Sequence, residues 1–338
     1  MMRLPRFRYF VPTSVKEALR IRAGEGPDAA FVAGGTDLYP NMKRRQQTPK
    51  SVIALSRIGV LRRLRAGETV LSIGAAVPLS AIERHRRVRR AHPALVHAIE
   101  EISTPPLRNM GTLGGNVLLD TRCNYYDQNY EWRQAIDFCM KKDGTVCWVA
   151  PGSPKCLAVQ SADSVPILIA LGASVVLASP DGEREIPLEA LYINDGIHYL
   201  TKRPEELLTE VRVPTRPGWT ASYRKLRRRG AFDFPVLAVG VAARLDDGRV
   251  AESRVVLGAV ASAPVRAPRA EAALEGRVLE AGSIAEAAEA ASGPSKPMDN
   301  TDFSFLWRKE MTKKWVAAAL SDLAPARKSR PAPAPGTS

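Results

Sequence analysis

The chain has 338 residues, of which 45% are hydrophobic and 25% are charged, a balance typical of a soluble globular protein. No apolar run approaches the length of a membrane span, and the N-terminus has no signal-peptide core, which favours a cytoplasmic protein without a membrane segment. At this length two or three domains are expected.

The formal net charge is +14, and Lys and Arg form runs at 43–45, 84–90 and 227–229. Such runs attract phosphate, but no helix-turn-helix, RNP or zinc-finger pattern accompanies them, and aromatic residues do not alternate with the basic ones. We therefore predict that the chain binds no nucleic acid. Solvated faces carry most of the excess charge, and contact with acidic protein partners is a secondary interpretation.

Residues 1–60 predict a small α/β unit. Strands are expected at 7–11, 29–33 and 51–55, and helices at 14–23 and 37–43. Ser14 and Glu17 have the spacing of a capping box. The second strand runs into Gly34-Gly35-Thr36-Asp37, a turn before a helix start, where backbone N–H groups can hold a diphosphate. A tight turn that needs positive φ is the alternative interpretation.

Residues 61–214 predict a second unit. Its expected elements are strands at 69–73, 174–178, 185–188 and 207–213, a capping box at 80–83, and helices at 94–102 and 165–171. Pro93 suits the first turn of the earlier helix, and Ser161-Ala162-Asp163 precedes the later one. Between these helices lies the glycine-rich segment Arg108–Asn116, and a linker is expected at 214–218.

Residues 219–323 predict a separate C-terminal domain. Three alternating strands at 221–226, 236–245 and 254–260 are followed by helices at 269–274, 284–291 and 304–323. In the last helix Phe305, Trp307, Met311, Trp315 and Ala319 recur at helical spacing, which favours core positions. The Pro-, Ala- and Lys/Arg-rich segment 324–338 is predicted to be disordered.

All four cysteines of the chain, Cys123, Cys139, Cys147 and Cys156, lie within 34 residues, with 15, 7 and 8 residues between them. A disulfide framework is disfavoured in a cytoplasmic chain. Four thiolates can bind zinc or an iron–sulfur cluster. Zinc sites usually use close pairs of cysteines, whereas this loose spacing favours a long loop around a four-iron cluster; zinc and free thiols remain alternatives. Intervening aromatic residues, Tyr125, Tyr126, Tyr130, Trp132, Phe138 and Trp148, would shield a cluster from water or pack as ordinary core.

Three segments together resemble the flavin subunits of molybdenum hydroxylases, a family that includes the xanthine dehydrogenase and carbon monoxide dehydrogenase flavoproteins. They are Phe31–Asp37, Arg108–Asn116 and Ser161–Pro166, and residues 219–323 resemble the family's C-terminal domain. The resemblance implies an α+β protein: a two-subdomain FAD-binding fold (PCMH-type, as in the vanillyl-alcohol oxidase superfamily) at 1–60 and 61–214, then an α+β domain with a three-stranded antiparallel sheet and helices.

The resemblance also implies which residues hold the cofactor. Val32, Ala33, Gly34, Gly35, Thr36 and Asp37 would surround the FAD diphosphate, and Thr112, Gly114, Gly115 and Asn116 would form a second wall. Asp163 would hold the ribose or adenine side, and Lys225 would lie near the flavin ring. Glycine lets the backbone approach a diphosphate, and small hydroxyls and amides supply hydrogen bonds.

In most such subunits the Asp-containing segment follows the Gly-Gly-Asn segment within about ten residues, whereas here the cysteine-rich segment at about 120–160 intervenes. This insertion resembles that of the β subunits of 4-hydroxybenzoyl-CoA reductases, in which four cysteines hold an extra [4Fe–4S] cluster. The resemblance assigns Cys123, Cys139, Cys147 and Cys156 as ligands.

The resemblance implies an electron-transfer subunit without catalytic residues of its own, and no hydrolase, metalloprotease or P-loop motif contradicts that. Its expected partners are a molybdopterin-binding large subunit and a [2Fe–2S] small subunit, in a dimer of heterotrimers, with ferredoxin as electron donor. The expected reaction is reductive dehydroxylation of an aryl-CoA in anaerobic aromatic degradation. The alternative is the flavin subunit of another molybdenum hydroxylase whose cysteine loop binds structural zinc or nothing.

Overall fold

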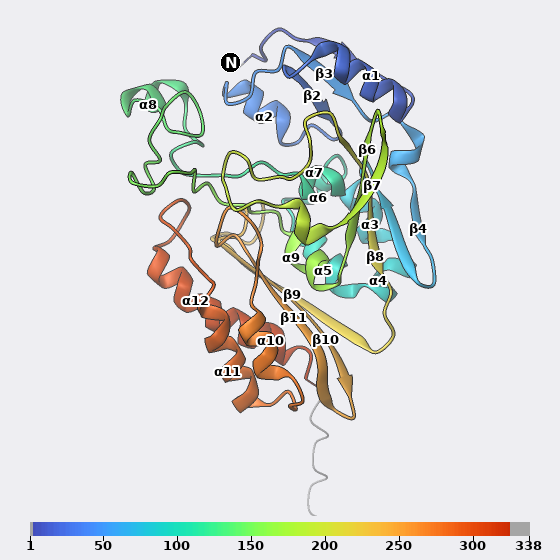
Figure 1. Cartoon of the computed structure of the whole chain (residues 1–338), viewed down its shortest axis with the longest axis vertical. Helices are drawn as coiled ribbons and strands as arrows, with labels where there is room; N and C mark the ends of the chain where they lie inside the picture. The colour runs from blue at the N-terminus through green and yellow to red at the C-terminus, as the bar shows by residue number, and fades with distance from the viewer. Residues whose placement is uncertain (1–2, 325–338) are drawn as a thin grey trace, which may run out of the picture.

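The computed structural model describes residues 3–324. From top to bottom, Figure 1 shows a small N-terminal α/β unit, a middle unit around the largest sheet, and a C-terminal unit in which helices cover one face of a sheet. A long irregular segment that carries one short helix projects to the left of the middle unit.

The N-terminal unit is a parallel sheet of β1 (Arg8–Phe10), β3 (Ser51–Ala54) and β2 (Ala29–Val32), in that spatial order, with α1 (Val15–Glu25) and α2 (Leu38–Lys43) as connections. The Ser14 hydroxyl accepts a hydrogen bond from the Glu17 amide at 3.2 Å, as the capping pattern predicts, although the Glu17 carboxylate reaches Thr13 instead of Ser14. The Gly34-Gly35 turn leaves the carboxyl end of β2, the edge of a parallel sheet at which ligands usually bind.

The middle unit is an antiparallel sheet in the order β4-β5-β8-β6-β7. A buried apolar core joins this sheet to the short helices around it. Its strands are β4 (Leu64–Ala66), β5 (Val70–Gly74), β6 (Ser174–Ser179), β7 (Gly182–Pro187) and β8 (Leu207–Pro214). Its helices are α3 (Leu79–Arg84), α4 (Arg86–Ala91), α5 (Pro93–Glu100), α6 (Pro105–Arg108), α7 (Leu113–Val117) and α9 (Ser164–Ala170), with 3₁₀ turns η1 (Gly59–Arg62) and η2 (Leu188–Leu191).

The C-terminal unit is an antiparallel sheet in the order β12-β11-β10-β9, covered by three helices. The sequence predicted three strands; the fourth, β12, has only two residues, too few to produce an alternating pattern. The elements are β9 (Trp219–Leu226), β10 (Leu237–Asp246), β11 (Arg249–Gly258), β12 (Val265–Arg266), α10 (Pro268–Leu274), α11 (Ala281–Ser292) and α12 (Phe305–Ser321).

Helix α9 joins the middle and C-terminal units. All seven of its residues are buried, and it packs against α5 and α7 as well as β10 and β11. Two strand glycines permit this packing: a Cβ on Gly240 would lie 2.5 Å from the Pro166 carbonyl carbon, and one on Gly258 would lie 2.6 Å from Pro166 Cγ. The helix therefore lies directly on the sheet backbone, and Asp163 at its start is fixed by both units.

Two local predictions are wrong. No capping box forms at Ser80, because Pro78 is the extended residue before α3 and the helix already begins at Leu79. In α12, Phe305 and Trp307 are exposed; the buried stripe begins at Arg308 and continues through Met311, so the first turn lies beyond the core that the spacing suggested. The predicted disorder at 325–338 lies outside the described residues.

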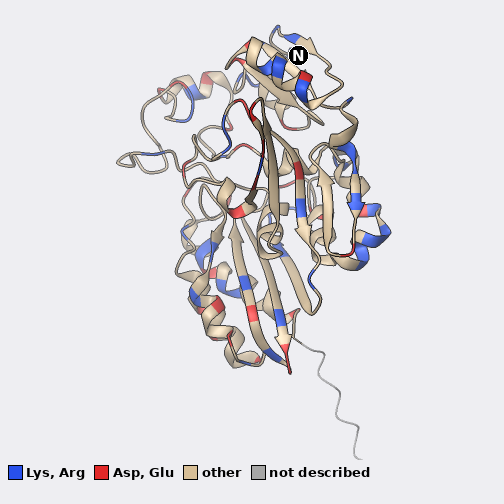
Figure 2. Ribbon diagram, turned by 45° about the vertical axis from the view of Figure 1, so that its right-hand side comes forward, with Lys and Arg blue, Asp and Glu red and all other residues tan. Residues whose placement is uncertain are grey.

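Charge is interleaved over much of the surface. Figure 2 shows Lys and Arg beside Asp and Glu on the strands of the C-terminal sheet, where Arg244 pairs with Glu252 at 3.3 Å. Within residues 3–324, no helix has both the length and the apolar character that crossing a bilayer requires.

Arg308 provides a test of how α12 is held to the sheet. This fully buried guanidinium donates hydrogen bonds to the carbonyl oxygens of Val236 (3.0 Å), Met298 (2.9 Å) and Ala259 (2.5 Å), and burial lowers its pKa to about 10. We predict that Arg308→Leu lowers the free energy of unfolding by about 2–4 kcal/mol, because three carbonyls each lose the hydrogen bond from the guanidinium.

Urea unfolding measures this loss. The exposed Arg269→Leu is the matched control, and we expect it to change stability by less than about 0.5 kcal/mol. Equal losses in the two variants would mean that the buried network contributes nothing specific.

Candidate functional site

A cavity of about 480 Å³, here called the large cavity, lies where the N-terminal unit, the middle unit and the β9–β10 loop meet. Its size is within the range of about 300–1,000 Å³ that small-molecule and cofactor sites occupy. Segments far apart in the sequence line it, including every cofactor-binding residue predicted above except Lys225: Val32, Ala33, Gly34, Gly35, Thr36, Asp37, Thr112, Gly114, Gly115, Asn116 and Asp163.

The two glycine segments meet backbone to backbone at this cavity. A Cβ on Gly34 would lie 1.8 Å from the carbonyl oxygen of Met110, and one on Gly114 would lie 2.7 Å from the carbonyl oxygen of Ala75. Gly35 adopts φ +72°, which L-residues avoid. The glycines thus agree with both interpretations of the sequence, the tight turn and the diphosphate site. They allow the turn geometry, and they leave main-chain atoms exposed to the cavity.

Thr112 and Asn116 hold the second segment in shape. The Thr112 hydroxyl accepts a hydrogen bond from the Gly115 amide at 3.1 Å and caps α7. Asn116 Oδ1 accepts from the amide and hydroxyl of Ser164, at 3.2 and 2.6 Å, and so ties α7 to the start of α9. These bonds occupy the acceptor of Asn116 and leave its amide NH₂ to donate to a ligand.

Asp163 lines the cavity at the end of a buried polar chain. Its Oδ1 accepts from the Tyr223 hydroxyl at 2.9 Å and pairs with Lys225 Nζ at 2.8 Å. Burial raises the pKa of Asp163 and lowers the pKa of Lys225, while each charge offsets part of that effect on the other. Lys225, which also donates to the Glu101 carbonyl at 2.8 Å, supports Asp163 from β9 and does not itself line the cavity.

Several polar residues of the large cavity were missed by the sequence analysis. They come from loops and single positions that have no periodic signal, and the sequence analysis assigned none of them to the cofactor site: Arg44, Arg108, Asp120, Arg122, Tyr199, Lys202, Glu206 and Asp233. Phe232 and Phe234, in the β9–β10 loop, add two partly exposed rings at its edge.

Arg122 connects three parts of the chain at the cavity. Its guanidinium pairs with Asp37 of the first glycine turn, lies 3.6 Å from Asp127, and stacks 4.1 Å from the centre of the Phe234 ring. These partners belong to the N-terminal unit, the cysteine-rich segment and the C-terminal unit. Arg122 therefore holds the rim of the large cavity in one arrangement.

A second, smaller cavity, here called the cysteine cavity, is lined by the four predicted ligand residues. Cys123, Cys139, Cys147 and Cys156 are all buried, free thiols, and Tyr126, Lys141 and Trp148 also line the space. The segment that carries them has one short helix, α8 (Tyr130–Ala135), and the Arg122–Val159 bridge closes its base. A long irregular segment inside a compact chain is usually functional.

The backbone around Cys139 is fixed in unusual conformations. Asp137, Phe138 and Asp143 have φ values of 59°, 58° and 69°, a region that non-glycine residues rarely adopt. A Cβ on Gly144 would lie 2.8 Å from the Cys139 amide nitrogen. Such conformations persist where the surroundings over-determine them and often occur at ligand sites.

Neutral thiols and two buried cations occupy the region of the cysteine cavity. Burial raises the pKa of the Cys123 thiol to about 12 and that of Cys156 to about 11, so these two thiols are neutral without a metal. The ammonium of Lys141 lies in the cavity wall. Arg133 in α8 is 1% exposed, and none of its three guanidinium nitrogens has a hydrogen-bond partner. The nearest carboxylate to this guanidinium is that of Asp143, with Oδ2 3.7 Å from an Arg133 Nη atom.

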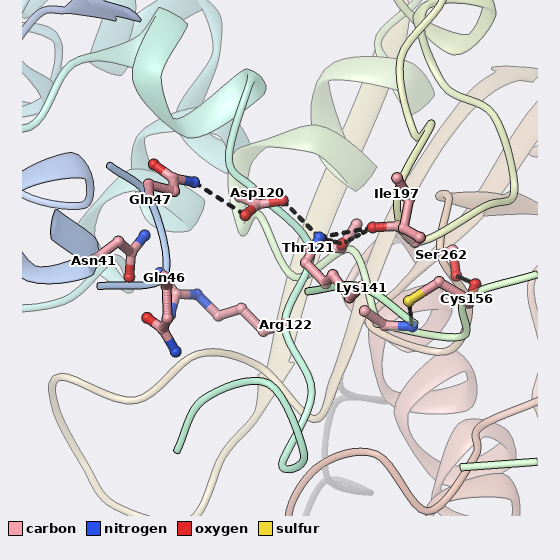
Figure 3. Close-up of polar contacts among 12 residues, drawn as sticks. Asn41, Gln46, Gln47, Asp120, Thr121, Arg122, Lys141, Cys156, Ile197 and Ser262 are labelled. Carbon is pink, nitrogen blue, oxygen red and sulfur yellow. Dashed lines mark hydrogen bonds and ion pairs between the residues drawn. The ribbon is translucent and has the colours of Figure 1, made fainter. Parts of the chain in front are cut away.

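An ion pair links the linings of the two cavities, and Figure 3 shows its residues, Asp120 and Lys141. Asp120, on the large cavity, pairs with Lys141 Nζ, on the cysteine cavity, at 2.9 Å. Asp120 also accepts from Gln47 Nε2 at 3.1 Å. Within the described residues, no three His, Cys, Asp or Glu side chains are grouped to hold a single metal ion.

The family model described as "FAD binding domain in molybdopterin dehydrogenase" matches residues 5–216, nearly the whole N-terminal and middle units. The chain belongs to this family. A second model, "CO dehydrogenase flavoprotein C-terminal domain", matches residues 221–323. The protein is thus an FAD-binding medium subunit of the molybdenum hydroxylase type, an oxidoreductase subunit, as the three sequence segments predicted.

Relatives match over most of their length. The chain is 28% identical to the alpha subunit of the 6-hydroxypseudooxynicotine dehydrogenase complex from Paenarthrobacter nicotinovorans, over 97% of this chain and 99% of that one. It is 32% identical to the aldehyde oxidoreductase FAD-binding subunit PaoB from Escherichia coli (strain K12), over 73% and 80%. Among solved structures, carbon monoxide dehydrogenase from Hydrogenophaga pseudoflava superposes with a TM-score of 0.80 at 28% identity, covering 95% of this chain and 98% of that one.

We predict that Gly34→Ala abolishes FAD retention, because the new Cβ collides with the Met110 carbonyl and separates the two glycine segments. The flavin-to-protein absorbance ratio of the purified chain measures this. Gly24→Ala is the control, because a Cβ there meets nothing within 4 Å, and it should retain FAD fully. A variant at Gly34 that retains FAD normally would exclude this cavity as the flavin site.

We predict that Arg122→Met speeds FAD release roughly tenfold, the effect of losing about 1.4 kcal/mol, because the rim loses its link to Asp37 and Phe234. Stopped-flow fluorescence of released flavin gives the rate. Arg228→Met, at an exposed pair with Asp302 away from the cavity lining, is the comparison and should release FAD at the wild-type rate.

Proposed function

We propose that this chain is the FAD- and [4Fe–4S]-containing electron-transfer subunit of a molybdenum hydroxylase-type enzyme of the 4-hydroxybenzoyl-CoA reductase kind. The observation that carries the proposal is the single cavity lined by all four cysteines, which adjoins the large cavity through the Asp120–Lys141 pair. Family membership supports the FAD part of the proposal, and the thiol-lined cavity supports the [4Fe–4S] part.

The loose spacing of the four cysteines along the chain favours a cluster over zinc, because zinc sites usually use close pairs of cysteines. Four sulfurs around one zinc ion lie about 3.8 Å apart, since each Zn–S bond is about 2.3 Å long. Such a grouping for one ion does not occur among the described residues, although the four sulfurs line one space. Four sulfurs bound to a cluster larger than one ion would line one space in this way without being grouped around a single point.

The charges of the chain also fit such a core. A [4Fe–4S]²⁺ core with four thiolates carries a charge of about −2. Lys141 in the cavity wall and the Arg133 guanidinium near Tyr126, whose carboxylate partner Asp143 lies 3.7 Å away, supply positive charge in the same region. The tetrathiolate would thus have its negative charge compensated, and Tyr126 and Trp148 would limit the access of water.

The residues of the large cavity would hold FAD by main-chain and small polar contacts. Gly34, Gly35 and Gly114 would present backbone to the diphosphate, with Val32, Ala33, Thr36, Asp37, Thr112, Gly115 and Asn116 completing the walls, and Asp163 would accept from ribose hydroxyls. Lys225 would act by fixing Asp163. When bound, FAD exchanges one or two electrons and an iron–sulfur cluster exchanges one.

We place the substrate chemistry on partner chains. The proposed assembly is a dimer of heterotrimers with a molybdopterin-binding large subunit and a [2Fe–2S] small subunit, supplied with electrons by ferredoxin in the cytoplasm. In this role the complex would remove the para hydroxyl of an aryl-CoA during anaerobic aromatic degradation. The assignment is tested by measuring how fast the co-expressed complex turns over 4-hydroxybenzoyl-CoA. Aldehydes and carbon monoxide are compared as alternative substrates.

The second candidate keeps the flavin and gives the cysteine segment a structural role, with zinc or no metal. Its support is that this segment contacts the C-terminal unit, where the Asn300 side chain donates to the Leu157 carbonyl at 2.6 Å. After anaerobic reconstitution, about four irons and four acid-labile sulfides per chain support the first candidate. About one zinc without sulfide supports the second.

We predict that Cys139→Ser abolishes the iron–sulfur absorption after reconstitution and leaves FAD bound, because Cys139 lines only the cysteine cavity. Visible absorbance with iron and flavin quantification measures both. Met140→Leu, a volume-conserving change in the same lining, is the control and should retain both cofactors. Loss of FAD together with iron would mean that the segment is required to fold the flavin site.

A further inference from the structure

Helix α2 is held at both ends by the cysteine-rich segment. At its start, Asp37 belongs to the first glycine turn and pairs with Arg122. After its end, the chain turns at Arg45, whose φ is 62°, and the next two side chains, Gln46 and Gln47, meet the segment (Figure 3). Because α2 directly follows the glycine turn, contacts that hold its two ends also hold one wall of the large cavity.

Gln46 is buried between the end of α2 and the segment. Its side chain is 3% exposed, and its Nε2 donates to the Tyr126 carbonyl at 2.6 Å and lies 3.5 Å from Asp127 Oδ1. The next residue, Gln47, donates from Nε2 to Asp120 Oδ2 at 3.1 Å. Gln46 lies outside the linings of both cavities, so it joins the two parts of the chain without entering either cofactor space.

Cys123 lies at the centre of the turn that Gln46 contacts. The Cys123 carbonyl oxygen accepts hydrogen bonds from the amide of Tyr126 at 3.0 Å and from the amide of Asp127 at 2.8 Å. These are the two residues that the Gln46 side chain meets. A metal core bound to the Cys123 sulfur would therefore fix, within one turn of the chain, the groups that hold the end of α2.

The segment has little regular structure to keep this turn in place without a core. Between Cys123 and Cys156 it contains the short helix α8 and bridges from Cys139, and all four of its cysteines are buried and free. Binding four thiolates to one core would close three loops, with 15, 7 and 8 residues between the cysteines, and would restrict the motion of the whole segment. A bound cluster would therefore stabilise the arrangement in which the Cys123 turn meets Gln46.

We propose that Gln46 is a positioning residue that couples the two cofactor sites, so that a cluster in the cysteine cavity strengthens the binding of FAD in the large cavity. This inference rests on the proposed function. The cluster fixes the Cys123 turn, the turn holds Gln46, and α2 then keeps the glycine turn in its binding geometry. FAD still binds without the cluster, as expected of Cys139→Ser, but less tightly. Coupled sites typically change each other's affinity by factors of about 5–150, and we expect about tenfold here.

Isothermal titration calorimetry under anaerobic conditions measures the coupling. FAD is titrated into the full-length, FAD-free chain, once with the reconstituted cluster and once without it. We expect the FAD dissociation constant to be about tenfold lower in the cluster-loaded chain. This comparison uses the wild-type sequence, so it decides whether the sites are coupled even if a variant fails to fold.

Gln46→Met tests the residue itself, because it removes the donor at nearly the same volume. The loaded and cluster-free forms of this variant should bind FAD equally, with the affinity of the cluster-free wild type. A merely structural role would instead weaken FAD binding by the same factor in both forms. Gln128→Met is the matched control, because Gln128 donates to the Asn124 carbonyl at 2.9 Å within the segment. It should keep the tenfold difference.

The outcomes separate this inference from the proposed function. If the wild-type chain takes up no iron and sulfide, the proposed function fails and the coupling fails with it. If the cluster forms but the FAD dissociation constant is the same in both forms, the coupling is overturned while the proposed function stands. If Gln46→Met keeps the difference, Gln46 is overturned as the positioning residue. A tenfold difference in the wild type and in Gln128→Met that is absent from Gln46→Met supports the inference.

Discussion

The structure depends on a close contact between the main chain of Gly34 and the main chain of Met110. Only glycine allows it, because any side chain at residue 34 would occupy the position of the Met110 carbonyl. The contact joins the N-terminal unit to the middle unit and leaves main-chain groups, in place of bulky side chains, along the large cavity. An anionic, extended cofactor needs such a surface, and the family match gives that cofactor as FAD.

Three charged pairs lie around this contact, and two of them bridge separate parts of the chain. Asp163 and Lys225 join α9 to β9, Arg122 and Asp37 join the cysteine-rich segment to the first glycine turn, and Asp120 and Lys141 separate the two cavities. Buried pairs of this kind contribute little net stability, because desolvation offsets their attraction. Their value here lies in fixed geometry, since each pair holds residues of a cavity wall in place.

The sequence predicted the parts of the site that depend on local patterns. Glycine turns after a strand and the Asn116 and Asp163 segments were recognisable, and the structure brings them to one cavity. The sequence alone could not predict which loop side chains reach that cavity. Arg122 and Phe234, for example, are brought together only by tertiary packing. Lys225 shows the same limit: its alternating strand position was visible, but the partner that turns it toward Asp163 lies on another unit. The two-residue β12 and the exposed first turn of α12 were missed because short elements and helix ends carry weak signals.

Helix α9 has a consequence for how the chain can be divided. One family model ends at residue 216 and the other begins at residue 221. Helix α9 lies in the region matched by the first model, yet it packs on the sheet in the region matched by the second. A fragment ending near residue 217 would expose the apolar flank of α9 that Pro166 presses against Gly240 and Gly258. The two matched regions therefore share part of their buried surface, and a truncation between them would expose apolar side chains that the whole chain keeps from water.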